Sequence, residues 1–304
     1  MRILVTGGAG FIGSNVVDAY IEAGHEVAVI DNLTTGKKDN LNPKAKFYQV
    51  DLRAKELAGI VAEFSPDVIS HHAAQIDVRK SVSDPIYNAD INELGTLNLL
   101  EAAVKAKVGK IIFSSTGGAL YGEVKARKGA DEKTAIEPIS PYAITKRSVE
   151  LYLYAYSVNH GLNYTVLRYG NVYGPRQDPL GEAGVIAIFC GLMLKGKTPI
   201  IYGDGKQLRD YVYVSDVARA NLLALSQGDK QTFNVGTGIG ISVNDLFRHL
   251  KDLLQFKDNA VYESARTGEL FRSVLDYSKI KKKLGWQAKL DIKQGLKQTL
   301  SWYK

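Results

Sequence analysis

Short apolar, β-branched runs alternate with longer amphipathic segments through the first half of this chain, and this alternation constrains the fold most. The runs predict strands at Arg2–Thr6, Glu26–Ile30, Lys46–Val50, Val68–His71, Lys110–Ser114 and Tyr164–Arg168. Between them, a spacing of about 3.6 residues predicts helices at Phe11–Ala23, Glu56–Phe64, Gly95–Ala106 and Ala143–His160. Alternation of this kind predicts a parallel, doubly wound sheet that helices cover on both faces.

After about Arg168 the pattern changes, because turn-forming Gly and Pro residues become frequent and strand-like runs become short. We predict a larger first domain over residues 1–168, to which a segment of about 211–236 returns. Its run Thr232–Val235 would add a seventh strand to the sheet. Residues 169–304 would mainly form a smaller mixed α/β domain, with a cleft between the two domains.

Composition excludes several classes of protein. With 304 residues and 45% apolar residues, the chain can bury a large core, which excludes global disorder. Its net charge of +7 is spread along the chain, unlike the clustered charge of most nucleic-acid binders, and it suits a phosphorylated small substrate. A single cysteine, Cys190, excludes a disulfide framework. The first residues already fit a strand and not a signal peptide, and no apolar run reaches the ~20 residues that a membrane span needs. We therefore expect a cytoplasmic protein.

A glycine-rich loop directly follows the first predicted strand. Gly7, Gly10 and Gly13 are spaced three apart, and Phe11 and Ile12 begin the first helix between them. Such a loop turns sharply and lets a pyrophosphate approach the backbone, where the helix N-terminus offers free N–H groups. The strand-loop-helix context predicts a Rossmann-type dinucleotide site.

Acidic residues follow the second and third predicted strands. Asp31, with Asn32 after it, can accept hydrogen bonds from both ribose hydroxyls of NAD and would repel the extra phosphate of NADP. Asp51 is followed by Leu52, and two interpretations of Asp51 are equally supported: a contact to the adenine, or an N-cap of the next helix. We therefore expect NAD as the cofactor.

Two groups of residues indicate proton transfer near that cofactor. Tyr142 and Lys146 are four residues apart on a predicted helix, so the ammonium can lie near the phenol. Together with an oxidised nicotinamide, it would lower the pKa of the phenol. Ser114, Ser115 and Thr116 end the fifth strand, at the edge of a parallel sheet where ligands bind. A hydroxyl group there can hydrogen-bond the substrate oxygen that loses its proton.

Together these motifs resemble the extended short-chain dehydrogenase/reductase family, and among its members the UDP-glucose 4-epimerases most. The resemblance also rests on His72-Ala73-Ala74 and Tyr121-Gly122, and it runs over nearly the whole chain. It implies further cofactor contacts at Leu52, Ala73, Ala74, Asn92 and Ser114. It places the catalytic hydroxyl on Thr116, but the segment from Ser114 to Gly122 is one residue longer than the common family form, so Ser115 remains a rival.

The resemblance also implies substrate contacts in the second half. Asn171 matches a contact to the phosphates of a nucleotide sugar, Arg209 and Arg266 match arginines on the diphosphate, and Glu269 matches a ligand of the uridine ribose. Planar cations suit a diphosphate, and a carboxylate suits a ribose diol. Ser273 stands where the family has a tyrosine that limits the pocket, and a small residue there leaves space for a 2-acetamido group.

The implied reaction is NAD-dependent inversion of C4 in a UDP-hexose through a transient 4-keto sugar, with UDP-glucose/UDP-galactose and also UDP-GlcNAc/UDP-GalNAc as candidate pairs. A UDP-glucuronate 4-epimerase or decarboxylase is an open alternative. A 4,6-dehydratase is disfavoured because Gly117-Gly118 stand where it needs acidic residues. A dinucleotide-sensing regulator is the non-enzyme alternative. No metal-ligand spacing is visible. Apolar positions that we expect to be exposed, such as Leu151, Leu153 and Tyr154, suggest a homodimer.

Overall fold

The computed structural model describes residues 1–179, 184–266 and 268–304. Its central feature is a seven-stranded parallel sheet of order β10-β6-β5-β4-β1-β2-β3. The predicted fold class is confirmed. The strands are β1 (Arg2–Thr6), β2 (Glu26–Ile30), β3 (Lys46–Tyr48), β4 (Val68–His71), β5 (Lys110–Thr116), β6 (Asn163–Tyr169) and β10 (Gln231–Val235).

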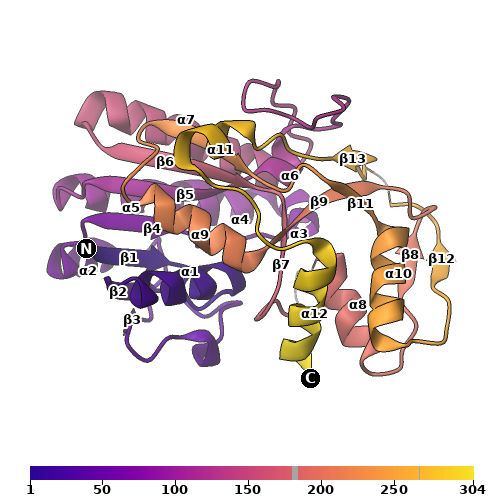
Figure 1. The fold of residues 1–304 in the computed structure, drawn as a ribbon. Coiled ribbons are helices and arrows are strands. Elements are labelled where there is room, and N and C mark those ends of the chain that lie inside the picture. Colours follow the sequence, from indigo (N-terminus) through magenta and orange to yellow (C-terminus); the bar gives the residue numbers. More distant parts are fainter. Residues whose placement is uncertain (180–183, 267) are drawn as a thin grey trace.

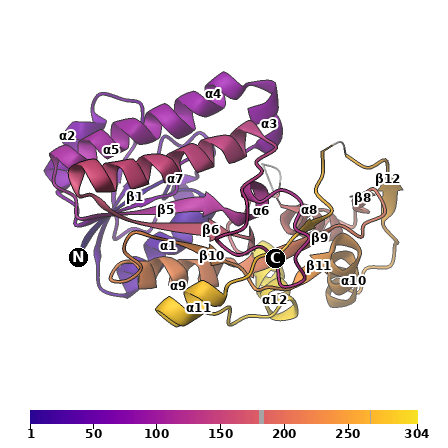
Figure 2. The same ribbon diagram turned by 90° about the horizontal axis from the view of Figure 1, so that it is seen from above.

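Helices cover both faces of this sheet, because its strands are apolar on both sides (Figures 1 and 2). One face packs on α2 (Leu57–Phe64), α5 (Gly95–Lys105) and α7 (Pro141–His160), through side chains such as Val61, Leu99 and Leu153. The other packs on α1 (Phe11–Glu22), α9 (Val214–Ala224) and α11 (Ser278–Leu284), through side chains such as Val17, Val217 and Ile280. Figure 2 shows the two helical layers on opposite sides of the sheet.

Local chemistry explains the limits of α7, the helix that carries Tyr142. Ser140 caps its N-terminus by accepting the N–H of Ala143 at 3.2 Å, and Pro141 occupies the first turn. The helix therefore starts two residues before the predicted Ala143. It ends at Gly161, whose φ of 70° suits glycine.

The second half forms a smaller mixed unit. Here β11 (Gly240–Ser242), β9 (Leu208–Tyr213), β13 (Arg272–Ser273) and β7 (Asn171–Tyr173) make one sheet, and β8 (Ile200–Tyr202) pairs with β12 (Val261–Glu263). Three helices share a core with these strands: α8 (Val185–Met193), α10 (Val243–Leu254) and α12 (Ile292–Tyr303). Figure 1 shows this unit beside the carboxyl ends of β5 and β6.

Several short elements had no clear periodic signal in the sequence. They are the 3-10 turn η1 (Lys38–Asn40), α3 (Val78–Ser83), α4 (Pro85–Ala89), the π-helical turn η2 (Asp90–Leu94) and α6 (Gly117–Leu120). Asp77 and Asp84 cap α3 and α4, and η2 joins α4 to α5. Among the described residues, no helix combines the length and apolar character that crossing a membrane requires.

Candidate active site

The strand order reverses direction at β1, whose neighbours are β4 and β2. In an open parallel sheet, ligands bind at such a point, beyond the carboxyl ends of the strands. The carboxyl ends of β1 to β5, with the segments that follow them, carry most of the predicted cofactor residues. The sheet therefore places them at one edge.

The glycine-rich loop after β1 has no room for side chains. Gly7 has a φ of 69°, and a Cβ there would lie 2.6 Å from the backbone nitrogen of Ala73. A Cβ on Gly13 would lie 2.2 Å from the carbonyl oxygen of Gly7. Gly10 is the N-cap residue of α1, and no described side chain caps this helix. The first backbone N–H groups of α1, including those of Phe11 and Ile12, therefore have no side-chain acceptor. This cradle fits a dinucleotide pyrophosphate.

Asp31 lies next to this loop at the end of β2. It is 8% exposed, and its Oδ2 accepts the N–H of Ala9 at 3.0 Å while Oδ1 accepts the N–H of Leu33 at 2.8 Å. A carboxylate oxygen has two lone pairs, so each oxygen keeps one acceptor direction. The fixed carboxylate fits a ribose diol.

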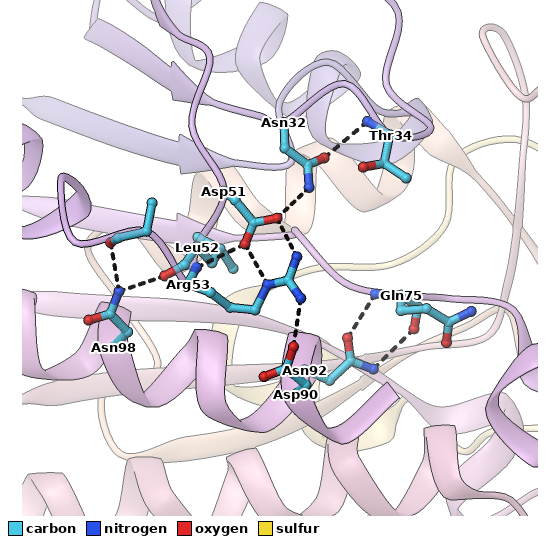
Figure 3. Close-up of polar contacts among 10 residues, drawn as sticks. Asn32, Thr34, Asp51, Leu52, Arg53, Gln75, Asp90, Asn92 and Asn98 are labelled. Atoms are coloured by element: carbon cyan, nitrogen blue, oxygen red, sulfur yellow. Dashed lines mark hydrogen bonds and ion pairs between the residues drawn. The ribbon is translucent and has the colours of Figure 1, made fainter. Parts of the chain in front are cut away.

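Asp51 belongs to a polar cluster that the sequence did not predict (Figure 3). Its carboxylate accepts Arg53 Nε at 2.8 Å, Arg53 Nη2 at 2.8 Å and Asn32 Nδ2 at 2.8 Å. Arg53 also reaches Asp90 on η2 at 2.6 Å, and it holds the pKa of Asp51 well below its usual value. The N-cap interpretation of Asp51 is wrong, because α2 begins only at Leu57.

The segment after β4 lies against the glycine-rich loop. The N–H of Ala73 donates to Thr6 Oγ1 at 3.2 Å, and Ala74 follows half-buried. Leu52, from the third loop, is 6% exposed, and its carbonyl accepts Asn98 Nδ2 at 2.7 Å (Figure 3). These three residues thus form apolar and backbone surface at the same edge of the sheet.

Asn92 is buried on η2 and ties two elements together. Its Oδ1 accepts the N–H of Gln75 at 2.8 Å, and its Nδ2 donates to the carbonyl of Gln75 at 3.0 Å (Figure 3). The same Nδ2 lies 3.1 Å from Thr145 Oγ1 on α7. The predicted cofactor contact at Asn92 stays a prediction, and its side chain joins the loop after β4 to the helix of Tyr142.

On α7, Lys146 is buried and Tyr142 is half-buried. The Lys146 ammonium is 5.8 Å from the centre of the Tyr142 ring and donates to the carbonyl of Ser114 at 2.9 Å. Burial raises the pKa of Tyr142 to about 12. Burial also lowers the pKa of Lys146 to about 7, although the charge of Glu150 acts in the opposite direction. The chain alone therefore does not lower the pKa of Tyr142, because burial disfavours the charged phenolate.

Ser114, Ser115 and Thr116, the hydroxyl residues that end β5, have different surroundings. Ser115 donates to Glu150 Oε1 at 2.7 Å, on the α7 side. Side chains alternate along a strand, so Thr116 lies on the opposite side. A Cβ built on Gly118 would lie 3.8 Å from Thr116 Oγ1 and 3.4 Å from Asn171 Oδ1, which places these two side chains around the same point.

Ser114 joins a buried polar chain through His72. Its Oγ is 2.6 Å from His72 Nδ1 and 3.2 Å from the hydroxyl of Tyr169, and His72 Nε2 is 2.9 Å from Ser70 Oγ. Burial lowers the pKa of His72 to about 3, so the imidazole is neutral. His72 belongs to the family motif in the sequence, but only the structure reveals these partners.

The predicted substrate residues of the second half come partly together. Arg209 on β9 pairs with Glu269 at 3.2 Å, and it lies opposite Ser273 in the register of β9 and β13. Ser273 donates to the carbonyl of Gly118 at 3.1 Å, beside Thr116. Arg266 instead lies against an aromatic ring, with its guanidinium 3.9 Å from the centre of the Tyr202 ring.

Tyr211 is a further polar residue of this region. It follows Arg209 by two positions on β9, so both side chains lie on the same side of the strand. Its hydroxyl is buried, and no described residue forms a hydrogen bond with it. A buried, unpaired hydroxyl is costly, so this group is available to a ligand. Across the described ranges, no group of three or more His, Cys, Asp or Glu residues could hold a metal ion.

Comparison with known proteins agrees with this geometry. The solved UDP-glucose 4-epimerase of Thermotoga maritima with UDP-glucose is 51% identical, with a TM-score of 0.98 over 100% of this chain and 98% of that chain. The UDP-glucose 4-epimerase of Thermus thermophilus in complex with NAD is 45% identical, with a TM-score of 0.95 over 100% of this chain and 99% of that chain. The UDP-N-acetylglucosamine 4-epimerase of Methanobrevibacter ruminantium, in complex with UDP-N-acetylmuramic acid, is 37% identical. Its TM-score is 0.94 over 99% of this chain and 97% of that chain. Residues 3–236 match the NAD dependent epimerase/dehydratase family, and the chain belongs to this family.

Proposed function

We propose that this protein is an NAD-dependent isomerase that inverts C4 of a UDP-hexose through a transient 4-keto sugar. One observation carries the proposal: Lys146, four residues from Tyr142 on α7, bonds to the carboxyl end of β5, at the sheet edge that also holds the glycine cradle and the fixed Asp31 carboxylate. The similarity to UDP-glucose 4-epimerases along the whole chain supports the same reaction.

The cofactor site fits NAD. The N–H groups at the start of α1 would hold the pyrophosphate, Asp31 would accept the ribose hydroxyls, and Asp51 and Leu52 would border the adenine. Oxidised NAD supplies a hydride acceptor and a positive charge when it is bound. That charge adds to Lys146 in opposing the effect of burial on the pKa of Tyr142.

The residues around the substrate have two proposed roles, proton transfer at the sugar and binding of the UDP portion. Tyr142, as phenolate, would take the proton of the sugar 4-hydroxyl, and Thr116 would hydrogen-bond the same oxygen. Ser115 is disfavoured for that role because its hydroxyl donates to Glu150. Arg209, Arg266, Asn171 and Glu269 would grip the UDP portion, which leaves the sugar free to turn so that C4 can present its other face.

The division of the chain follows from this assignment. Residues 1–168, with the return segment at about 211–236, would bind NAD, and residues 169–304 would mainly bind the UDP-sugar. In support, β10 lies in the central sheet, whereas β7 and β9, which carry Asn171 and Arg209, lie in the second sheet.

We also place the enzyme in the cytoplasm as a homodimer. Cys190 is free and buried, as suits a reducing compartment. On α7, Leu151, Tyr154 and Val158 are 52%, 61% and 66% exposed, and an exposed apolar stripe of this kind favours pairing with a second copy.

The test is incubation with a panel of UDP-sugars, read by NMR for inversion at C4. The wild-type protein should interconvert UDP-glucose and UDP-galactose. Tyr142→Phe should lose at least about a thousandfold in kcat, because it removes the only proposed base. Turnover of that variant near the wild-type rate would show that Tyr142 is not the base.

A further inference from the structure

Glu150 is a buried acid on the catalytic helix to which neither the sequence nor the proposed reaction gives a role. It follows Lys146 by four residues and Tyr142 by eight, so the three side chains lie on successive turns of α7. It is only 5% exposed. A buried carboxylate is costly unless it is paired and hydrogen-bonded, so its partners are informative.

The carboxylate of Glu150 joins three segments of the chain. Oε1 accepts Ser115 Oγ at 2.7 Å and Arg168 Nε at 2.8 Å, from β5 and β6. Oε2 accepts Arg168 Nη2 at 2.5 Å and Arg147 Nη1 at 2.9 Å. Arg168 is itself held, because its Nη1 donates to the hydroxyl of Tyr121 at 2.7 Å. All four lone pairs of Glu150 are thus in use.

These contacts fix the end of β5 against α7 at two adjacent residues. Lys146 donates to the carbonyl of Ser114, and Glu150 accepts from the side chain of Ser115. Ser115 is held toward α7, and Thr116, the next residue of β5, lies on the other side of the strand. Pairing with Tyr169 on β6 sets the backbone at Thr116, and the contact of Glu150 ties the residue directly before it to the catalytic helix.

The same cluster sets the charge around Lys146. Burial favours the neutral form of Glu150, but hydrogen bonds from Arg168, Ser115 and Arg147 outweigh it and hold the pKa below its usual value. The ionised Glu150 supports the ammonium of Lys146. His71 at the end of β4 and His72 just after it also lie near Lys146, and burial lowers the pKa of both, so they stay neutral.

We propose that Glu150 is a positioning residue: it holds Ser115 and Arg168 so that Thr116 and Lys146 stay aligned with Tyr142. The inference rests on the proposed function, in which Tyr142, Lys146 and Thr116 act on the sugar. In this proposal Glu150 acts through its neighbours and does not contact the substrate.

The experiment compares Ser115→Ala and Glu150→Gln with Ser157→Ala, a control at a buried serine farther along α7. Each NAD-loaded variant is assayed with UDP-glucose across pH, and its thermal unfolding is measured. Ser115→Ala changes no charge, so it should lower kcat about tenfold, with KM and the pH profile unchanged. Glu150→Gln removes the negative charge that raises the pKa of Lys146, so that pKa should fall. The limb of its pH profile that reports Lys146 should move about one unit toward lower pH.

Wild-type kcat in Ser115→Ala, or an unmoved pH profile in folded Glu150→Gln, would overturn the proposal. If Glu150→Gln does not fold, Ser115→Ala decides the question alone, because it leaves the pairing of Glu150 with Arg168 and Arg147 in place. Ser157→Ala should match the wild type in kcat. Full activity of Tyr142→Phe would instead refute the proposed catalytic set, so the two failures are distinguishable.

Discussion

At the scale of single residues, the small side chain of Ser273 leads to a prediction about which sugar the site accepts. Its side chain is 2% exposed and donates to the carbonyl of Gly118, next to Thr116. A tyrosine needs far more space than this buried serine occupies, and we expect its ring to enter the neighbouring site. We predict that Ser273→Tyr lowers kcat/KM for UDP-GlcNAc at least about tenfold more than for UDP-glucose, as expected for a steric clash with one acetamido group.

The measurement is kcat/KM for both sugars in the variant and in Ser301→Tyr, a control at an exposed serine on α12. The control should treat both sugars as the wild type does. An equal loss on the two sugars in Ser273→Tyr would reject the role of this position in selecting the sugar.

At the scale of secondary structure, the junction of β1 and α1 depends on the absence of a Cβ. In Gly13→Ala the new methyl group would lie 2.2 Å from the carbonyl oxygen of Gly7, so α1 or the loop has to move. We predict a loss of about 1–3 kcal/mol in the free energy of unfolding and at least about tenfold weaker NAD binding. Urea unfolding and calorimetric titration with NAD measure the two effects.

Gly59→Ala is the matched control, because Gly59 lies within α2 and a Cβ there meets nothing within 4 Å. Alanine favours a helix over glycine by about 1 kcal/mol, so this variant should gain stability and keep its affinity for NAD. Unchanged NAD affinity in Gly13→Ala would contradict the assignment of the loop as the pyrophosphate cradle.

At the scale of the whole molecule, helix α7 has one apolar side that packs in the core and one that is exposed. The interpretation of Leu153 as exposed is wrong: it is 1% exposed and packs in the core, whereas Leu151, Tyr154 and Val158 remain uncovered. We predict that Leu151→Asp weakens self-association at least about tenfold, since it places a charge in the pairing surface. Light scattering after size-exclusion chromatography measures the mass.

Leu253→Asp, at a 40% exposed leucine on α10, is the control and should leave the mass unchanged. If wild-type protein elutes as a monomer at micromolar concentration, the proposed homodimer is refuted whatever the variants do.

The sequence alone determined the features that depend on neighbouring residues. The glycine spacing, the β-branched runs and the caps of α7 act within a few residues, so the central sheet, its main helices and the place of Tyr142 and Lys146 were all predictable. The short helices α3 and α4 were not, because five or six residues are too few for a periodic signal.

Only the tertiary structure decided which polar groups meet. Ser115 and Thr116 are equivalent in the sequence, and they differ because Glu150 lies on one side of β5. Asp51 resembles an N-cap until Arg53 and Asp90 are seen around it. The Ser115–Glu150 and Arg53–Asp90 contacts join residues 35 and 37 positions apart. Their energy depends on burial and on the partner, which local spacing does not encode.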